Sequence, residues 1–174
     1  NISRAAGRVS YPCRFQLVAA MNPCPCGYAN DTQRECRCAP GQISRYHHKV
    51  SGPLLDRIDL HLYVPRPSAQ VLAGGGEAGS SSSEVRQRVL AARAIQDQRG
   101  LLNRDLSSQQ LTNSGLISDT ARQLLRKVAE KKALSARAWF RAMKVARTIA
   151  DLDDSPVAGE NHMAEALHLR FVEL

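Results

Sequence analysis

Two short apolar segments in the first part of the chain predict β-strands. Residues 15–21 (FQLVAAM) form an apolar run that ends at Asn22 and Pro23, which is typical of a buried strand stopped by a proline. Residues 58–64 (IDLHLYV) alternate apolar and polar positions with a period of two, and Pro65 follows them. Because two strands alone do not make a stable sheet layer, we expect them to be the last strands of a larger α/β sheet.

Beyond residue 83 the apolar positions change to helical spacing. On one face of the helix predicted for residues 84–98 lie Val85, Val89, Ala92 and Ile95. Ser118 and Ser135 are predicted N-caps of two further helices with apolar stripes, and a last helix is predicted from residue 161 or 162 to residue 171. We therefore expect an all-α bundle after the sheet fragment.

A segment rich in glycine and serine separates these two parts. Residues 73–83 (AGGGEAGSSSS) have the composition of a flexible linker. The predicted organisation is a sheet fragment in residues 1–72, a linker in residues 73–83 and a helical bundle in residues 84–174. The first residue is Asn rather than Met, so we expect the chain to be an excerpt of a longer protein.

Charge and composition narrow the function classes. Lys and Arg together number 24 and Asp and Glu 16, which gives a formal net charge of +8. This excess fits a phosphate-rich partner, either a nucleotide or a nucleic acid, although a solvated basic surface would have the same composition. The apolar runs are far shorter than the roughly 20 residues of a membrane-spanning helix, so we expect no membrane partner and a cytoplasmic location.

Four of the five cysteines form two Cys-x-Cys pairs. They are Cys24, Cys26, Cys36 and Cys38. Four thiols so close in the sequence, with Gly27 to turn the chain, can converge as a tetrahedral structural zinc site. Paired ligands of structural zinc usually have two to four residues between them, and here there is one. A reduced, metal-free loop is therefore the other interpretation.

Two polar residues adjoin the predicted strands. Asn22 follows the first strand and would lie at the carboxyl edge of a sheet, where its amide can hold a water and a phosphate oxygen. An ordinary Asn-Pro turn is the alternative for Asn22. Arg57 precedes the second strand between Asp56 and Asp59. Held by these carboxylates, its guanidinium could reach a transferring phosphoryl group as an arginine finger, or it could form a structural Arg–Asp pair.

Three basic residues share one face of the helix that Ser135 is predicted to begin. Arg137, Arg141 and Lys144 are spaced by four and three residues, which suits contact with the phosphates of a nucleotide or of DNA. A solvated basic face is the alternative. The 174 residues contain no GxxxxGK[ST] phosphate loop, so we do not expect this chain alone to bind a nucleoside triphosphate.

Several of these segments together resemble one protein family. They are FQLVAAMNPCPCGY, the second Cys-x-Cys pair, SGPLLDRIDLHLYVPR, LSARAWFRAMKVARTIADL and HMAEALHLR. They are similar to segments of the magnesium-chelatase-like AAA+ ATPases of the YifB/ComM family, and the similarity extends from Ser3 to about Arg170. The resemblance implies that the chain is the C-terminal third of such a protein, with the last strands of an AAA+ P-loop NTPase core followed by a helical lid.

The resemblance also implies roles for individual residues. Asn22 falls at sensor 1, which orients the attacking water, and Arg57 falls at the arginine finger, which acts in trans on the ATP of the neighbouring subunit. Arg137 falls at sensor 2, which touches the phosphates of its own subunit's nucleotide. The family implies a homo-hexamer that uses ATP with Mg²⁺, held mainly by upstream residues, to remodel DNA as a branch-migration helicase. From the residues alone, a non-catalytic basic helical module that binds DNA or a partner protein is the alternative.

Overall fold

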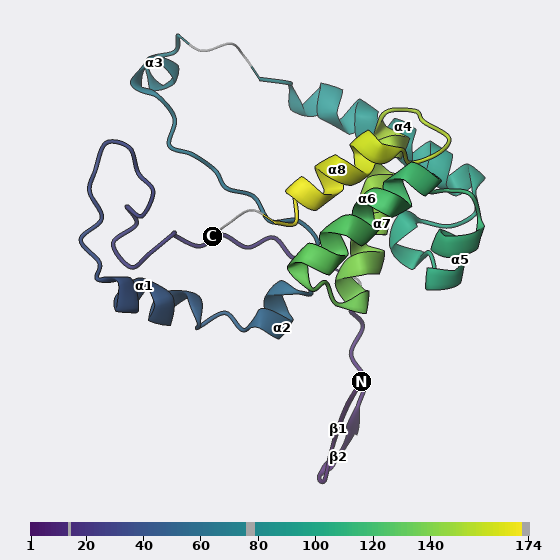
Figure 1. The fold of residues 1–174 in the computed structure, drawn as a ribbon, viewed down its shortest axis with the longest axis horizontal. Coiled ribbons are helices and arrows are strands. Elements are labelled where there is room, and N and C mark those ends of the chain that lie inside the picture. The colour runs from purple at the N-terminus through teal and green to yellow at the C-terminus, as the bar shows by residue number, and fades with distance from the viewer. Residues whose placement is uncertain (14, 76–78, 172–174) are drawn as a thin grey trace. The chain divides into compact units, whose positions relative to one another are not determined.

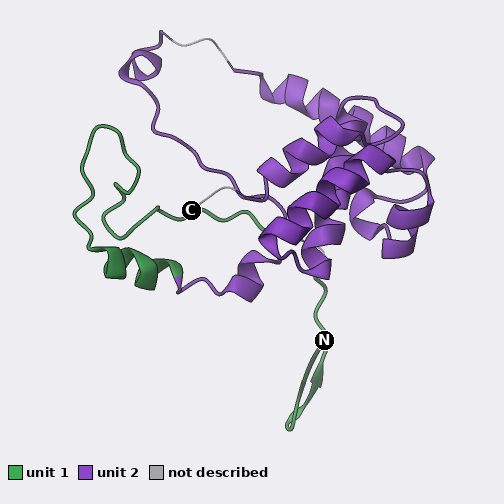
Figure 2. Cartoon of the chain, viewed as in Figure 1, with its two compact units in different colours: residues 1–47 green, residues 48–174 purple. Residues whose placement is uncertain are grey.

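The structure is a computed structural model that describes residues 1–13, 15–75 and 79–171. It divides into two compact units, residues 1–47 and residues 48–174, which are coloured green and purple in Figure 2. Residues 76–78 of the predicted linker and residues 172–174 of the predicted bundle lie outside the described residues. The boundary between the two units falls between His47 and His48. The domain boundaries predicted from the sequence, at residues 72 and 84, stay predictions.

The first unit consists of a hairpin, a cysteine-containing loop and one helix (Figure 1). Strand β1 (Ile2–Arg4) pairs antiparallel with β2 (Gly7–Val9), so that Ile2 lies opposite Val9. After the loop, helix α1 (Pro40–His47) begins with a proline, whose fixed φ suits the first turn of a helix. No side chain of α1 is buried, so this helix does not build a core for the unit.

Neither of the two predicted strands forms in the structure. Residues 15–21 and 58–64 run without strand pairing, and the β1–β2 hairpin is the one sheet among the described residues. Side chains expected to be buried are exposed, with Phe15 at 73% and Val18 at 84%. A strand needs a partner for its backbone N–H and C=O groups, and within the described residues no second strand lies beside either segment. The described chain is therefore mostly helical, and the expected α/β sheet is not present in it.

The second unit is built of helices. In chain order its elements are α2 (Gly52–Leu55), α3 (Ala69–Leu72), α4 (Ser82–Gln98), the 3₁₀ helix η1 (Asn103–Asp105), α5 (Ser108–Asn113), α6 (Asp119–Lys132), α7 (Ala136–Leu152) and α8 (Glu160–His168). The two predicted N-caps are confirmed. The Ser118 hydroxyl accepts a hydrogen bond from the backbone N–H of Ala121 at the start of α6, and the Ser135 hydroxyl accepts one from Ala138 at the start of α7.

Helix α4 begins earlier than predicted and is less buried. The Ser81 hydroxyl accepts from the backbone N–H of Glu84, whose carboxylate in turn accepts from the backbone N–H of Ser81. This capping box draws the serines of the predicted linker into the helix start. Of the predicted apolar face, Ala92 is buried, whereas Val85 and Val89 are each 46% exposed. Only the C-terminal half of α4 has buried side chains, so the N-terminal half does not contribute to the core.

The core of the second unit is organised around α7. Its apolar stripe is confirmed, because Met143, Ala146 and Ala150 are buried and Trp139 packs against them at the edge of the core. The small alanine side chains let α7 lie close to α8, which contributes the buried Met163. Helix α6 packs on α8 in the same core. No helix in the described part of the chain is long and apolar enough to cross a membrane.

Candidate functional site

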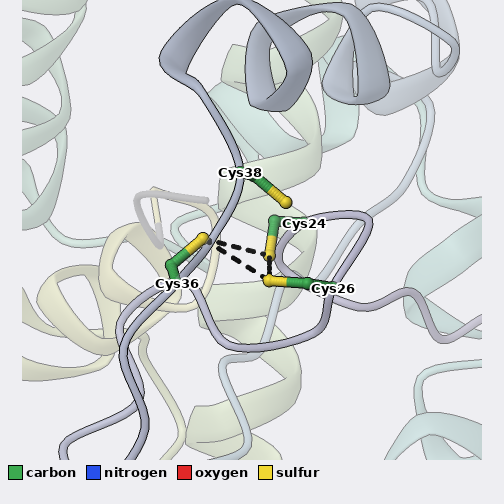
Figure 3. Close-up of side chains that lie close together, drawn as sticks. All are labelled: Cys24, Cys26, Cys36 and Cys38. Carbon is green, nitrogen blue, oxygen red and sulfur yellow. Dashed lines mark hydrogen bonds between the residues drawn. The ribbon is translucent and has the colours of Figure 1, made fainter.

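The four paired cysteines converge in the loop between β2 and α1. The sulfur atoms of Cys24, Cys26, Cys36 and Cys38 all lie within 4.8 Å of one another (Figure 3). The Cys24 Sγ is 3.3 Å from that of Cys26 and 3.6 Å from that of Cys36, so these contacts are not disulfides. Zn–S bonds of about 2.3 Å in a tetrahedron would place the sulfurs roughly 3.8 Å apart. The geometry therefore fits four thiolates around one metal ion, and it is the one such group among the described residues.

Tight turns bring the two pairs together. The backbone N–H of Gly27 bonds the carbonyl of Cys24 at 3.0 Å, and Gly27 has a φ of +84°, which an L-residue adopts only with strain. The backbone N–H of Ala29 then points at the Cys24 sulfur, 3.3 Å away. His47 is not part of the four-cysteine group. Its Nε2 instead donates a hydrogen bond to the carbonyl of Pro23 at 2.7 Å, which connects α1 to the cysteine-containing loop. The local sequence thus builds the cluster within one unit.

The protonation of the thiols is unequal. Backbone N–H groups of Tyr28 and Arg37 bond the Cys26 sulfur and lower the pKa of Cys26 to about 6. At Cys36 a backbone hydrogen bond from Cys38 lowers the pKa of the thiol. Burial and the hydrogen bonds with the neighbouring sulfurs raise it and have the larger effect, so that the pKa of Cys36 is about 12. Four sulfurs this close cannot all be thiolates without a cation. The N–H groups that stabilise thiolate are of the kind that surrounds sulfur ligands of a metal.

Asn22 lies immediately before this cluster and is exposed. Its amide nitrogen would lie 3.8 Å from a Cβ atom placed at Gly27, which is ordinary van der Waals contact. The strand expected before Asn22 does not form, so the described residues do not place it at a sheet edge. Asn22 belongs to the first unit, and the basic candidates belong to the second.

A second cluster in the other unit surrounds the carboxylate of Asp56. The buried guanidinium of Arg170 donates to Asp56 Oδ1 at 2.8 Å, and the Ser135 hydroxyl donates to Asp56 Oδ2 at 3.0 Å. Arg137 Nη1 lies 3.7 Å from the same Oδ2. The next acidic residue, Asp59, forms an ion pair with Arg141. Both carboxylates that flank Arg57 are therefore bound by residues from α7 and from the segment after α8.

Arg57 itself is exposed and binds neither of these carboxylates. Its Nη1 donates to the backbone carbonyl of Pro53 at 2.6 Å. The expectation that Asp56 and Asp59 would hold the Arg57 guanidinium is thus wrong, because arginines distant in the sequence take both of them. Arg57 thus lies just after the end of α2, and among the described residues its exposed guanidinium is hydrogen-bonded to one backbone carbonyl.

The three basic residues predicted to share a face of α7 have different surroundings. Arg137 is half exposed, and within the part of the chain that the structure describes its ion-pair partner is Asp56, at the long distance of 3.7 Å. Arg141 is paired with Asp59, and Lys144 donates to the backbone carbonyl of Arg104 at 2.6 Å. Burial lowers the pKa of Lys144. Of the three, Arg137 is the side chain that can most readily turn toward another group.

Sequence reasoning missed a buried ionic network on α7. Arg147 and Asp151 are both fully buried, and the Arg147 Nη2 donates to Asp151 Oδ1 at 2.8 Å. Arg99, at the end of α4, donates to Asp151 Oδ2 at 2.6 Å, and the Asn103 side-chain amide donates to it at 2.7 Å. Burial alone would raise the pKa of Asp151, but the hydrogen bonds from Arg99 and Asn103 and the Arg147 charge outweigh it and lower the pKa. An Arg and an Asp four residues apart, inside an apolar stripe, were the signal for this network.

Comparison with known proteins gives two family matches. Residues 1–72 match the family model described as magnesium chelatase, subunit ChlI, and residues 79–170 match the one described as magnesium chelatase, subunit ChlI C-terminal.

Among individual proteins, the chain is 43% identical over 170 residues to competence protein ComM of Haemophilus influenzae. It is 41% identical over 174 residues to YifB of Escherichia coli and 38% identical over 175 residues to Rv2897c of Mycobacterium tuberculosis. These matches cover 97 to 99% of this chain and 33 to 34% of the relatives. The chain therefore spans about a third of the length of these relatives and corresponds to their C-terminal part.

Proposed function

This chain belongs to the magnesium chelatase subunit ChlI family, and from that membership we propose that it is the C-terminal part of an ATP-driven AAA+ motor. In the complete protein, residues 1–72 would supply the last strands of the ATPase core and residues 84–174 the helical lid. The exposed apolar side chains of residues 15–21 support this view, since such a segment would be buried beside further strands.

The observation that carries the proposal is that the Arg57 guanidinium is exposed and forms no ion pair with the acidic residues beside it. An arginine finger must present a guanidinium that is not already neutralised, because it stabilises charge that develops on the transferring phosphoryl group. In this structure the neighbouring carboxylates, Asp56 and Asp59, are bound by other arginines. We assign Arg57 the role of arginine finger in trans, acting on ATP held by the adjacent subunit.

Two further residues complete the proposed nucleotide site. Arg137, half exposed and weakly paired, would act as sensor 2 on the phosphates of its own subunit's nucleotide. Asn22 would act as sensor 1 and orient the attacking water through its amide. Mg²⁺ would neutralise charge on the phosphates when ATP is bound, and upstream residues would hold most of the nucleotide.

We further propose a homo-hexamer that acts on DNA in the cytoplasm as a branch-migration helicase. The in-trans role of Arg57 requires a second copy of the chain. The net charge of +8, together with the DNA remodelling that the family resemblance implies, favours DNA as the partner. Arg141 and Lys144 are proposed phosphate or DNA contacts. Each would first have to leave its present partner, Asp59 or the carbonyl of Arg104.

The cysteine cluster is proposed to hold a structural Zn²⁺. The sulfur separations of 3.3 and 3.6 Å and the backbone donors around Cys24 and Cys26 support this assignment. Bound zinc would cross-link the two Cys-x-Cys pairs and so fix the loop that begins directly after Asn22.

Steady-state ATP hydrolysis by the full-length protein tests the proposal. Arg57→Ala is expected to lower kcat by about 10³-fold or more while nucleotide binding is retained, because the finger acts in the transition state. Arg126→Ala, a change at an exposed lid arginine, serves as the matched control and should keep the wild-type rate. Unchanged turnover in Arg57→Ala, together with tight and steeply salt-dependent binding of duplex DNA by this chain, would favour the non-catalytic basic module instead.

A further inference from the structure

The Arg170 side chain forms hydrogen bonds with the backbone on both sides of Arg57. Arg170 is 6% exposed and lies two residues beyond the end of α8. Its Nη1 donates to the carbonyl of Ile58 at 3.1 Å, and its Nη2 donates to the carbonyl of Asp56 at 3.1 Å and to Asp56 Oδ1 at 2.8 Å. One planar guanidinium thus binds the residue before Arg57 and the residue after it.

Such a contact is specific to arginine. A buried cation requires partners for its charge and its N–H groups, and here a carboxylate and two carbonyls supply them. The guanidinium can do this because its donors form a rigid fork, whereas a lysine has a single ammonium group. Loss of Arg170 would leave the half-buried Asp56 carboxylate without its closest counter-charge and both carbonyls without their donor.

Other contacts from the lid attach the same segment. The Ser135 hydroxyl, which caps α7, also donates to Asp56 Oδ2. Farther along, the backbone N–H of His61 donates to the carbonyl of Leu169 at 2.6 Å, next to Arg170. The segment on both sides of Arg57 is therefore fixed to the ends of two lid helices, while the Arg57 side chain itself is turned to solvent.

We infer that Arg170 is a positioning residue for Arg57. By holding the Asp56 and Ile58 carbonyls it sets the direction in which the Arg57 guanidinium leaves the chain. Arg170 does not touch the nucleotide in this scheme. The inference rests on the proposed role of Arg57 as an arginine finger and deepens it, because the group that acts on the neighbour's ATP is then aimed by the lid of its own subunit.

The test combines kinetics and hydrogen exchange on the full-length protein. The variants are Arg170→Gln, Arg57→Ala and their double mutant, with Arg126→Gln as the control at an exposed lid arginine. We expect Arg170→Gln to lower kcat by roughly 10- to 100-fold, the range expected when a catalytic group is misplaced by about 1 Å. The KM for ATP should stay within about a factor of two, because the interaction is made in the transition state.

Two readouts separate positioning from general damage to the lid. In Arg170→Gln the backbone amides of residues 52–61 should exchange faster, while those of α6 and α7 keep wild-type protection. In the Arg57→Ala background, Arg170→Gln should cause no further loss of kcat, because it has no finger left to position. Arg170→Lys, which keeps the charge but not the fork, should show the same kinetic defect and is used if the Gln variant does not fold.

Three outcomes would overturn the inference. Wild-type kcat in Arg170→Gln despite faster exchange at residues 52–61 would show that the attachment does not matter for turnover. An equal additional loss in the double mutant would show that Arg170 acts independently of Arg57. Full activity in Arg57→Ala would instead refute the proposed finger, and the inference with it, and this result is recognised without any Arg170 variant.

Discussion

Replacement of Asp151 by asparagine is expected to lower the free energy of unfolding of the second unit by about 3–5 kcal/mol, the cost typical of breaking a buried ion pair. The magnitude follows from what the carboxylate binds. Its two oxygens accept hydrogen bonds from both Nη atoms of Arg99, from the Asn103 amide, and from Nε and Nη2 of Arg147. An asparagine offers one oxygen, and its NH₂ group would face donors. Arg147, fully buried, would keep its charge without a counter-charge.

Urea unfolding followed by tryptophan fluorescence measures this effect. Trp139 is the chain's single tryptophan. It lies on α7, the helix that also carries Asp151, and packs against the core of the second unit. Asp97→Asn, at an exposed position of α4, is the matched control and should leave the transition unchanged. A loss below about 1 kcal/mol in Asp151→Asn, or a loss equal to that of the control, would refute the reasoning, since it would mean that the buried arginines find other partners.

The same residue predicts a dependence of stability on pH. The pKa of Asp151 in the folded state is lowered from its ordinary value of 3.8. Its stabilising contribution is therefore fully present above that value, and it is lost as the pH falls through the lowered pKa. The stability difference between wild type and Asp151→Asn should thus be constant near neutral pH and shrink below about pH 4. A difference that did not change down to pH 2 would contradict the assignment.

Further predictions concern the metal and the start of α7. In the purified protein, atomic emission should find about one zinc ion per chain. The double variant Cys24→Ser/Cys36→Ser should contain no zinc, whereas the control Cys13→Ser, at a position outside the cluster, should keep it. Equal zinc in all three proteins would exclude the site. Ser135→Ala should destabilise the second unit by about 1–2 kcal/mol in the same urea assay, because it loses the N-cap. Ser135→Thr should retain most of the stability, and equal losses in both variants would argue against the hydroxyl as the cause.

The helices of the second unit were predictable because their signals are local. A serine before an apolar stripe satisfies the first backbone N–H groups of a helix, and this located the starts of α6 and α7 at Ser118 and Ser135. The convergence of the four cysteines was predicted for the same reason, since both pairs lie in one loop. The zinc ion itself stays a prediction.

Features that depend on distant partners were not predictable. The strands expected at residues 15–21 and 58–64 need neighbouring strands, which the described residues do not supply. Arg57 was the predicted partner of Asp56 and Asp59. In the structure Asp56 instead binds Arg170, which lies 114 positions away in the sequence. The periodicity of a sequence indicates which face of an element is apolar, but it does not indicate which distant charge will reach a given carboxylate.

The exposed segment at residues 15–21 has a consequence for the handling of this chain. It is a seven-residue run without charge or proline, with Leu17 at 58% and Val18 at 84% exposed. Such runs pair with copies of themselves and form intermolecular β-structure. Preparations of the chain alone should therefore aggregate as the concentration rises, and Val18→Lys, which adds a charge to this run, should keep them soluble for crystallisation or spectroscopy.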